Sequence, residues 1–270
     1  MMADAASSVR DVGSAGWAGR RLASEWKFTI ASLALGIVIW ALIASQFSGF
    51  VLASPLDVVA TLWRDTISGE MPTRFAGALV HMVIGFLISV AVAIPLGLVV
   101  GRSKVLTDLI EPTLTAIFAI PIVAFVPFVI IWFGLRIEAR IALVFIMCVL
   151  DMYFIVAAGA RDIDRKLVDA ARSFGASSAL TFRAVILPAS MPFVFTALRI
   201  GVVRAVNAMI TAELFFAAVN LGEYMKDASN NFDSAGVIAI LVILSATGLG
   251  LQEFVRRSEA KLLPWHIRKG

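Results

Sequence analysis

Apolar residues gather in six long stretches along the chain, with shorter polar segments between them. A helix needs roughly 20 apolar residues to cross the hydrocarbon core of a bilayer, and all six stretches reach or approach that length. The pattern therefore predicts an all-α bundle of six membrane-spanning helices, over Phe28–Phe47, Phe75–Gly101, Leu109–Phe133, Ile141–Ala160, Phe193–Ala218 and Ala235–Leu251.

Three of these spans should not be simple straight rods. Proline removes a backbone N–H and clashes with the preceding turn, so Pro112, Pro121 and Pro127 predict a bent or broken third span. The second and fifth stretches are longer than a bilayer needs, which predicts tilting, kinking or projection beyond it. The sixth stretch is short, and we expect it to continue through Gln252 and Glu253.

The connection between the first two stretches also contains helical spacing. Within Ser48–Arg74 a proline is followed by an apolar pattern that includes Trp63, and the segment ends in polar residues. This pattern predicts a short helix at the outer interface. Trp63 fits an interfacial anchor there, with packing against the core as the alternative.

Composition places the chain among integral membrane proteins. Of its 270 residues, 60 % are hydrophobic and 16 % are charged, whereas soluble domains have about a quarter of their residues charged. A single cysteine, Cys148, excludes a disulfide framework, and two histidines, His81 and His266, are too few to build a metal site. Basic residues that flank apolar spans fit membrane topology better than nucleic-acid binding.

The distribution of Lys and Arg predicts the orientation of the spans. Sixteen of the 23 fall on the side of the two termini, five fall on the opposite side and two lie within the fifth stretch. Because basic residues favour the cytosolic side, both termini are expected there. We therefore divide the chain into a disordered cytosolic tail (1–27), a six-span membrane domain (28–256) and a second cytosolic tail (257–270).

A signal peptide is the alternative for the first stretch, because basic residues precede it. That stretch is about twice the usual length of a signal's apolar region, and no clear A-x-A site follows it. We interpret it as an uncleaved first span.

One charged segment, residues 162–188, lies on the cytosolic side of this topology, and we call it the polar loop. Its first half has helical spacing, Gly175 then allows a turn, and a second short helix is expected from about Ser177 to Ile186, ended by Leu187-Pro188. The simplest interpretation is an amphipathic loop resting on the membrane. Two short helices with small residues, Ala170 and Ala171, would also suit docking by a partner.

The polar loop resembles the EAA signature of ABC-importer permease subunits, which reads E-A-A-x3-G-x9-I-x-L-P. Here the pattern is Asp169-Ala170-Ala171, Gly175, Val185 and Leu187-Pro188, with Asp for the leading Glu and Val for the Ile. Further matches are similar to permeases of the nitrate/sulfonate/taurine type, at Leu52–Pro55, Ile94–Gly97, Gly101, Glu111-Pro112, Ala119–Pro121, Pro127, Trp132–Gly134, Leu198-Arg199, Ala212-Glu213 and Leu221-Gly222.

This resemblance implies a bacterial inner-membrane permease that works as a pair of six-span subunits, most simply a homodimer. Two separate ATPase subunits would bind it, and a periplasmic or lipoprotein binding protein would supply a small organic or inorganic anion. ATP and Mg²⁺ would be used by the ATPase, so this chain is expected to need no cofactor or metal and to have no catalytic residues. The implied coupling residues are Asp169, Ala170, Ala171, Gly175, Leu187 and Pro188.

Polar residues inside the spans are candidates for the translocation pathway, because ions in a bilayer usually face a cavity or a partner. Our candidates are Asp151, Arg204, Asn207 and Glu213. Pairing of Asp151 with Arg204 is one hypothesis for the carboxylate, and a role in substrate choice is the alternative. For Glu213, structural pairing or gating is favoured. Arg199 is expected to extend to the headgroups, and His81 is more typical of a packed histidine than of a ligand.

A transporter driven by an ion gradient is the main alternative from another class. It would predict inverted repeats, which the sequence does not show, and it would leave the EAA pattern unexplained. The chain contains no Walker A motif, no HExxH and no GxSxG, so neither ATP hydrolysis nor an intramembrane hydrolase is indicated.

Overall fold

The computed structural model describes residues 14–216 and 220–262, and it describes side chains from residue 28 onward within those ranges. All regular elements in these ranges are helical. They are α1 (Ser14–Ala44), α2 (Pro55–Ile67), α3 (Glu70–Arg102), α4 (Lys104–Phe118), η1 (Ile122–Phe125), α5 (Val126–Phe133), α6 (Ile137–Arg161), α7 (Arg165–Ser173), α8 (Ser178–Thr181), η2 (Phe182–Ile186), α9 (Leu187–Phe216), α10 (Asn220–Asn230) and α11 (Ser234–Leu262).

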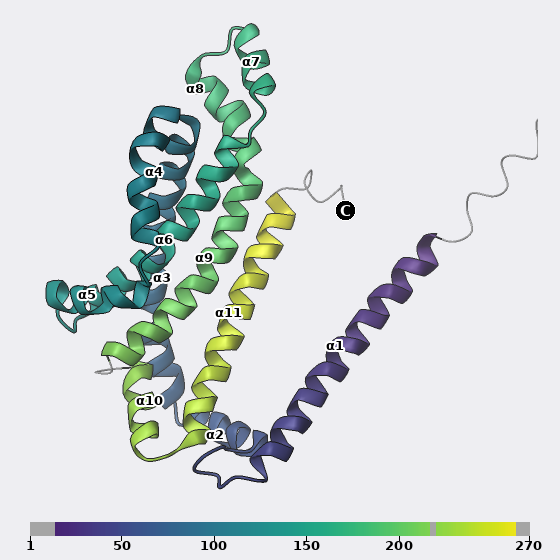
Figure 1. Cartoon of the computed structure of the whole chain (residues 1–270). Helices are drawn as coiled ribbons and strands as arrows, with labels where there is room; N and C mark the ends of the chain where they lie inside the picture. Colours follow the sequence, from purple (N-terminus) through teal and green to yellow (C-terminus); the bar gives the residue numbers. More distant parts are fainter. Residues whose placement is uncertain (1–13, 217–219, 263–270) are drawn as a thin grey trace, which may run out of the picture.

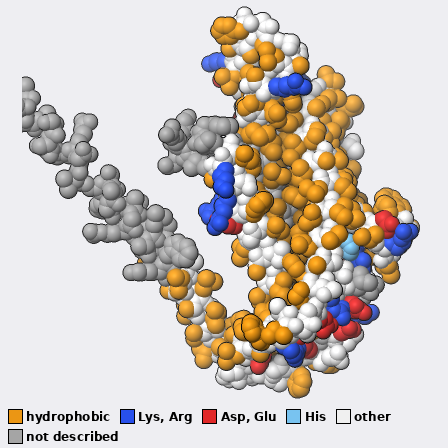
Figure 2. Space-filling view, turned by 180° about the vertical axis from the view of Figure 1, so that it is seen from behind, with side chains coloured by type: hydrophobic (Ala, Val, Ile, Leu, Met, Phe, Trp, Pro, Cys, Tyr) orange, Lys and Arg blue, Asp and Glu red, His pale blue; other side chains and the backbone are white. Residues whose placement is uncertain are grey.

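The core of the bundle is the helix α6, which packs between α3 and α9 (Figure 1). Its side chains Leu143, Met152 and Tyr153 are fully buried. α11 lies beside α9, while α1 runs at an angle away from the other helices and meets them at the end near α2 (Figure 1). Figure 2 shows that hydrophobic side chains cover the middle of one face of this bundle, as expected for contact with lipid.

Glycines bring α3 and α6 into close contact. A Cβ built at Gly97 would lie 2.8 Å from the Cβ of Val156, and one at Gly85 would lie 2.7 Å from the Cβ of Val144. Small residues at such positions allow two backbones to approach closely within a bilayer, where packing contributes much of the association between helices.

Replacing Gly97 with alanine should therefore destabilise the bundle. The added methyl group overpacks a filled contact, a change that typically costs about 1–3 kcal/mol. The sole cysteine, Cys148, is fully buried, so labelling by a thiol-reactive dye during heating reports unfolding. The matched control is Gly36→Ala in α1, where a Cβ meets nothing within 4 Å; equal midpoints for the two variants would contradict the tight packing.

The structure does not confirm the count of six spans. Four helical segments in the described ranges are long and apolar enough to cross a membrane, namely α3, α6, the continuous segment Ser178–Phe216, and α11. The bent pair formed by α4 and η1–α5 gives a fifth candidate. The described apolar part of α1, Phe28–Ala44, is shorter than these candidate spans, and the helix ends at Ala44, before the predicted boundary at Phe47.

The predicted break in the third span is confirmed. Its two halves meet at an angle of 89°, and Pro121 lies in the break between them. Pro112 instead lies inside α4, and Pro127 occupies the first turn of α5, where a missing N–H is tolerated. One of the three prolines therefore coincides with the bend.

Other predicted boundaries differ from the structure. The N-terminal tail, expected to be disordered to residue 27, is helical from Ser14, and residues 1–13 lie outside the described part of the chain. The sixth span continues as predicted, but it runs to Leu262 and so includes the first residues of the predicted C-terminal tail. Residues 263–270, and the predicted end of the fifth span at Ala218, also lie outside the described part.

The predicted short helix in the outer connection is α2. A capping box starts it, with the Ser54 and Asp57 side chains satisfying each other's backbone N–H groups. Trp63 is 70 % exposed, so the packed interpretation is wrong, while its role as an interfacial anchor stays a prediction.

Polar contacts join α2 and α3 to α10 at this end of the bundle. The Tyr224 hydroxyl donates a hydrogen bond to the buried carboxylate of Asp65, and Arg74 forms an ion pair of 2.9 Å with Glu223. Burial, followed by the hydrogen bond to Asp65, raises the pKa of Tyr224 above its usual range. The tyrosine therefore stays neutral and keeps donating at physiological pH.

Candidate functional site

The polar loop folds as two short helices, as predicted. α7 begins after Asp164, whose side chain accepts a hydrogen bond of 2.9 Å from the Lys166 N–H. α8 begins after Ser177, whose hydroxyl accepts from the Leu180 N–H at 3.3 Å. These caps satisfy backbone donors that the start of a helix leaves unpaired, so the loop has a defined local structure.

Gly175 makes the turn between the two helices, which confirms its predicted role. Its φ is +80°, in the left-handed region that favours glycine. Its N–H donates to the carbonyl of Arg172 at 2.9 Å, and the N–H of Ala176 donates to the carbonyl of Ala171 at 3.1 Å. This pattern closes the C-terminal end of α7.

The predicted end of the second helix at Leu187-Pro188 is wrong. α8 continues through η2 into α9, so these two residues begin the membrane helix. η2 is a π-helical turn, and this wider turn directly before Pro188 lets the helix pass a residue that lacks an N–H and would clash with a regular preceding turn. The polar loop is therefore joined to α9 by continuous helix.

One face of α7 anchors the polar loop internally. Val168 is buried and forms a small apolar cluster with Ile163 and Ile186. This cluster connects α7 to the segment that leads into α9, so the two are joined by packed side chains as well as by the backbone.

The other face of α7 presents apolar side chains to solvent. Leu167 is 53 % exposed and Phe174 is 92 % exposed, and Ala170 is exposed between them. These three residues follow helical spacing. We call them the apolar stripe of α7. An exposed apolar patch rimmed by charged residues typically marks a protein contact.

The predicted coupling residues fall into two groups in the structure. Asp169, Ala170, Ala171 and Gly175 lie together on α7 and its C-terminal turn. Leu187 and Pro188 lie beyond η2, at the base of α9. The first group belongs to the surface of the loop, and the second joins that surface to the membrane helix.

Asp151 and Arg204 form an ion pair between α6 and α9, which confirms the predicted pairing. The Nε of Arg204 lies 2.8 Å from Oδ2 of Asp151, and an Nη2 donates to Oδ1 at 3.4 Å. The Asp151 side chain is 11 % exposed and the Arg204 side chain 42 %. The carboxylate is thus enclosed, whereas part of the Arg204 side chain is exposed at the surface.

Arg204 belongs to a partly polar stripe on α9. Ile200, Asn207 and Leu214 are exposed on this helix, and Arg204 and Thr211 are partly exposed at the intervening positions. The spacing places the five residues on one face. In a bilayer, Arg and Asn side chains on an uncovered face favour contact with a water-filled space or another subunit over contact with lipid.

Glu213 does not share that exposed face. It is 3 % exposed, and its carboxylate accepts a hydrogen bond of 2.9 Å from the Gly222 N–H at the start of α10. A Cβ at Gly222 would clash with the Glu213 backbone, so this contact requires glycine. Its position gives Glu213 the structural contact that the sequence favoured.

Arg199 does not extend freely to the headgroups as expected. It forms an ion pair of 2.6 Å with Glu259 of α11, since α11 continues far enough beyond its apolar part to bring that glutamate alongside α9. His81 is buried on α3, in agreement with a packed histidine.

Sequence reasoning missed Arg140, which it counted among the outer-side cations. The side chain is 4 % exposed, and its guanidinium lies 5.9 Å from the centroid of the Phe216 ring. The start of α6 at Ile137 places Arg140 one turn inside the helix, where α9 covers it. The apolar residues that follow it were the only signal in the sequence, and they did not distinguish a buried arginine from an interfacial one.

Comparisons with known proteins agree with this architecture. Residues 93–263 match the family described as binding-protein-dependent transport system inner membrane component. A probable ABC transporter permease protein of Brucella abortus (strain 2308) is 30 % identical over 239 residues, which cover 88 % of this chain and 95 % of the relative. The taurine transport system permease protein TauC of Escherichia coli (strain K12) is 26 % identical over 262 residues, covering 92 % and 94 %.

A solved structure shares the fold. The crystal structure of an amino acid ABC transporter with histidines aligns with a TM-score of 0.52 at 18 % identity, and the match covers 71 % of this chain and 97 % of the solved chain. Taken with the helical bundle and the EAA-like loop, these matches show that the chain belongs to the family of binding-protein-dependent transport system inner membrane components and is a multi-pass ABC permease of the nitrate/sulfonate/taurine type.

Proposed function

We propose that this permease receives mechanical work from a separate ATPase through the apolar stripe of α7. The exposure of Leu167 and Phe174 on a capped, internally anchored loop is the observation that carries the proposal. A short amphipathic helix of this kind suits a helix-in-groove contact. ATP and Mg²⁺ are used by the ATPase, and this chain holds no cofactor of its own.

Movement of the ATPase would tilt the spans through the continuous helix from α8 to α9. Because η2 and the Val168 cluster connect α7 to α9, the polar loop and α9 can move together. Such a rigid-body displacement would switch the pathway between outward-facing and inward-facing forms. The polar loop and both termini lie in the cytosol in this proposal, as the distribution of Lys and Arg indicates.

The translocation pathway forms between two copies of the chain, along the partly polar stripe of α9. Arg204 and Asn207 face the pathway, and the enclosed Asp151 holds the arginine in place. The positive charge of this partly exposed side chain favours an anionic substrate. A periplasmic or lipoprotein binding protein delivers this substrate, which we place among sulfonates, taurine, nitrate and aromatic carboxylates.

Uptake into proteoliposomes tests the proposal. The chain is reconstituted with its partner ATPase and binding protein. Labelled taurine, nitrate and benzoate are then offered with and without ATP on the side of the membrane that holds the ATPase. We expect uptake of at least one probe that requires ATP and survives collapse of ion gradients by ionophores. ATP-independent uptake that the ionophores abolish would favour the gradient-driven alternative and overturn the proposal.

A further inference from the structure

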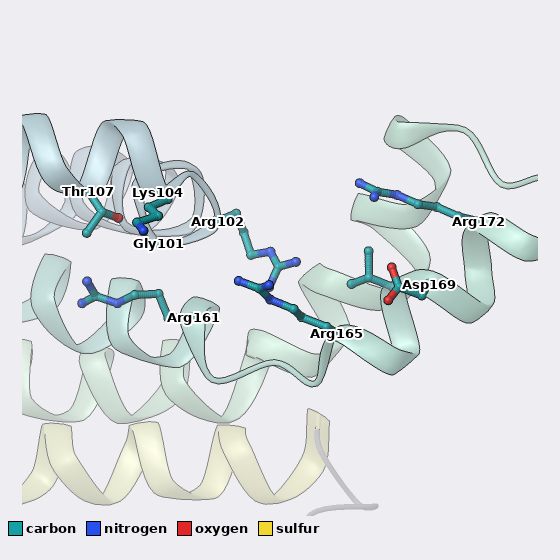
Figure 3. Close-up of a pocket in the computed structure, with 9 residues that line it drawn as sticks. Gly101, Arg102, Lys104, Thr107, Arg161, Arg165, Asp169 and Arg172 are labelled. Carbon is teal, nitrogen blue, oxygen red and sulfur yellow. The ribbon is translucent and has the colours of Figure 1, made fainter.

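A basic cavity lies between the polar loop and the ends of the membrane helices. Its volume is about 550 Å³, and Figure 3 shows side chains from the α3–α4 turn, the end of α6 and α7 around it. Five cationic side chains and one carboxylate line it, together with Gly101, Thr107 and Val168; the charged residues are Arg102, Lys104, Arg161, Arg165, Arg172 and Asp169. This volume falls within the range of roughly 300–1,000 Å³ typical of small-molecule sites.

Most of the positive charge in the cavity is not neutralised within the chain. Arg161 is paired with Glu111 at 2.7 Å, and Arg102 donates to the carbonyl of Ala160 at 3.3 Å. Among the described residues, no ion pair involves Lys104, Arg165 or Arg172. Like charges brought together in this way repel one another, so the arrangement is stabilised by a bound anion.

The backbone adds to the attraction for an anion. α4 begins at Lys104 on the edge of the cavity, and the N-terminal end of a helix carries a partial positive charge. The Thr107 hydroxyl donates to the carbonyl of Val100, and this hydrogen bond of 2.9 Å fixes the turn that presents Lys104. The cationic groups on this side therefore have a defined position.

Exposed apolar side chains also lie on α4, on a different face of the helix from Lys104 and Thr107, which line the cavity. Val105 is 75 % exposed and Leu109 is 71 % exposed, one turn apart, and Pro112 continues the exposed face toward the middle of the helix. Asp108 lies between the two faces, so the apolar face does not continue the cavity; it is suited to contact with lipid beside it.

We propose that this cavity binds the phosphate headgroup of an anionic phospholipid from the membrane leaflet on the side of the polar loop, whose acyl chains remain in the leaflet that the apolar face of α4 contacts. Basic pockets at the cytosolic ends of membrane helices bind such headgroups. The assignment of that leaflet to the cytosol rests on the proposed function. Because α7 forms one wall of the cavity, a bound lipid would also hold the polar loop against the bundle.

Native mass spectrometry of the full-length chain, purified in neutral detergent with and without its ATPase, tests the proposal. The probes are dioleoylphosphatidylglycerol, dioleoylphosphatidylcholine and inorganic phosphate. We expect the phosphatidylglycerol to be retained, the phosphatidylcholine to be retained at least about tenfold more weakly, and millimolar phosphate to displace little of the bound lipid. Because lipid retention requires neither nucleotide nor transport, it can succeed or fail independently of the proposed function.

Variants that remove positive charge from the cavity, compared with a matched surface variant, test whether these residues bind the lipid. The triple variant K104Q/R165Q/R172Q should lose at least about tenfold in phosphatidylglycerol affinity. The control triple variant R183Q/R256Q/K261Q removes the same charge from exposed positions outside the cavity and should retain the lipid. Equal retention by the two variants, equal retention of the two lipids, or displacement by phosphate alone would overturn the assignment.

Discussion

Uptake should fall at least about tenfold when Ala170 is replaced by tryptophan, because a loss of only about 1.4 kcal/mol in docking weakens an association tenfold. Ala170 lies at the centre of the apolar stripe of α7, between Leu167 and Phe174. A bulky ring there prevents close approach of a partner surface, while its exposed position leaves the fold of the loop undisturbed. We expect normal membrane insertion, loss of ATPase co-purification and loss of uptake in proteoliposomes.

The control for this substitution is Ala260→Trp, at another exposed alanine near the same end of the bundle. It should retain both the ATPase and uptake. Gly175→Pro gives an independent test, because proline fixes φ near −65° whereas Gly175 requires +80°. The turn would then have to change and α7 would be presented differently. Normal uptake by Ala170→Trp or Gly175→Pro would count against coupling through this surface.

The sequence predicted those parts of the fold that depend on local chemistry. Hydrophobic length located the long helices, and Gly175 located the turn in the polar loop. The three prolines of the third stretch predicted its break without showing which of them marks it. Each of these signals acts within a few residues of its effect. The first helix was less well predicted, because the apolar length of a segment does not determine where the helix ends or which helices it contacts.

Tertiary contacts set the features that sequence reasoning missed. The burial of Arg140 depends on α9 lying over the start of α6, and the ion pair of Arg199 depends on the direction of α11. The helix also continues through Pro188 because a π turn precedes it, and no residue type specifies such a turn. Pairing of Asp151 with Arg204 was predictable because two opposite charges in apolar surroundings have few other partners.

Neutralising Arg204 should destabilise the protein more than neutralising Asp151, its partner in the ion pair. Removing one partner from a buried pair typically costs about 3–5 kcal/mol, and the cost should be larger when the enclosed carboxylate is the group left behind. Arg204→Gln leaves Asp151, which is 11 % exposed, without its partner, whereas Asp151→Asn leaves an arginine that is 42 % exposed and can be solvated. Thermal unfolding followed by size-exclusion chromatography should therefore show the lower midpoint for Arg204→Gln.

Uptake measurements should distinguish the roles of Asp151 and Arg204 further. Arg204→Gln removes the charge proposed to attract the anion and should lower its uptake. Arg204→Lys and Asp151→Asn preserve a positive charge, so each should retain more uptake than Arg204→Gln. The double variant D151R/R204D restores opposite charges across the same contact between α6 and α9, so it should recover part of the stability lost by Arg204→Gln. It should not recover anion uptake, because the exposed position then carries a carboxylate. Absence of any recovery in stability would contradict the pairing, and full recovery of uptake would contradict a role for Arg204 in the pathway.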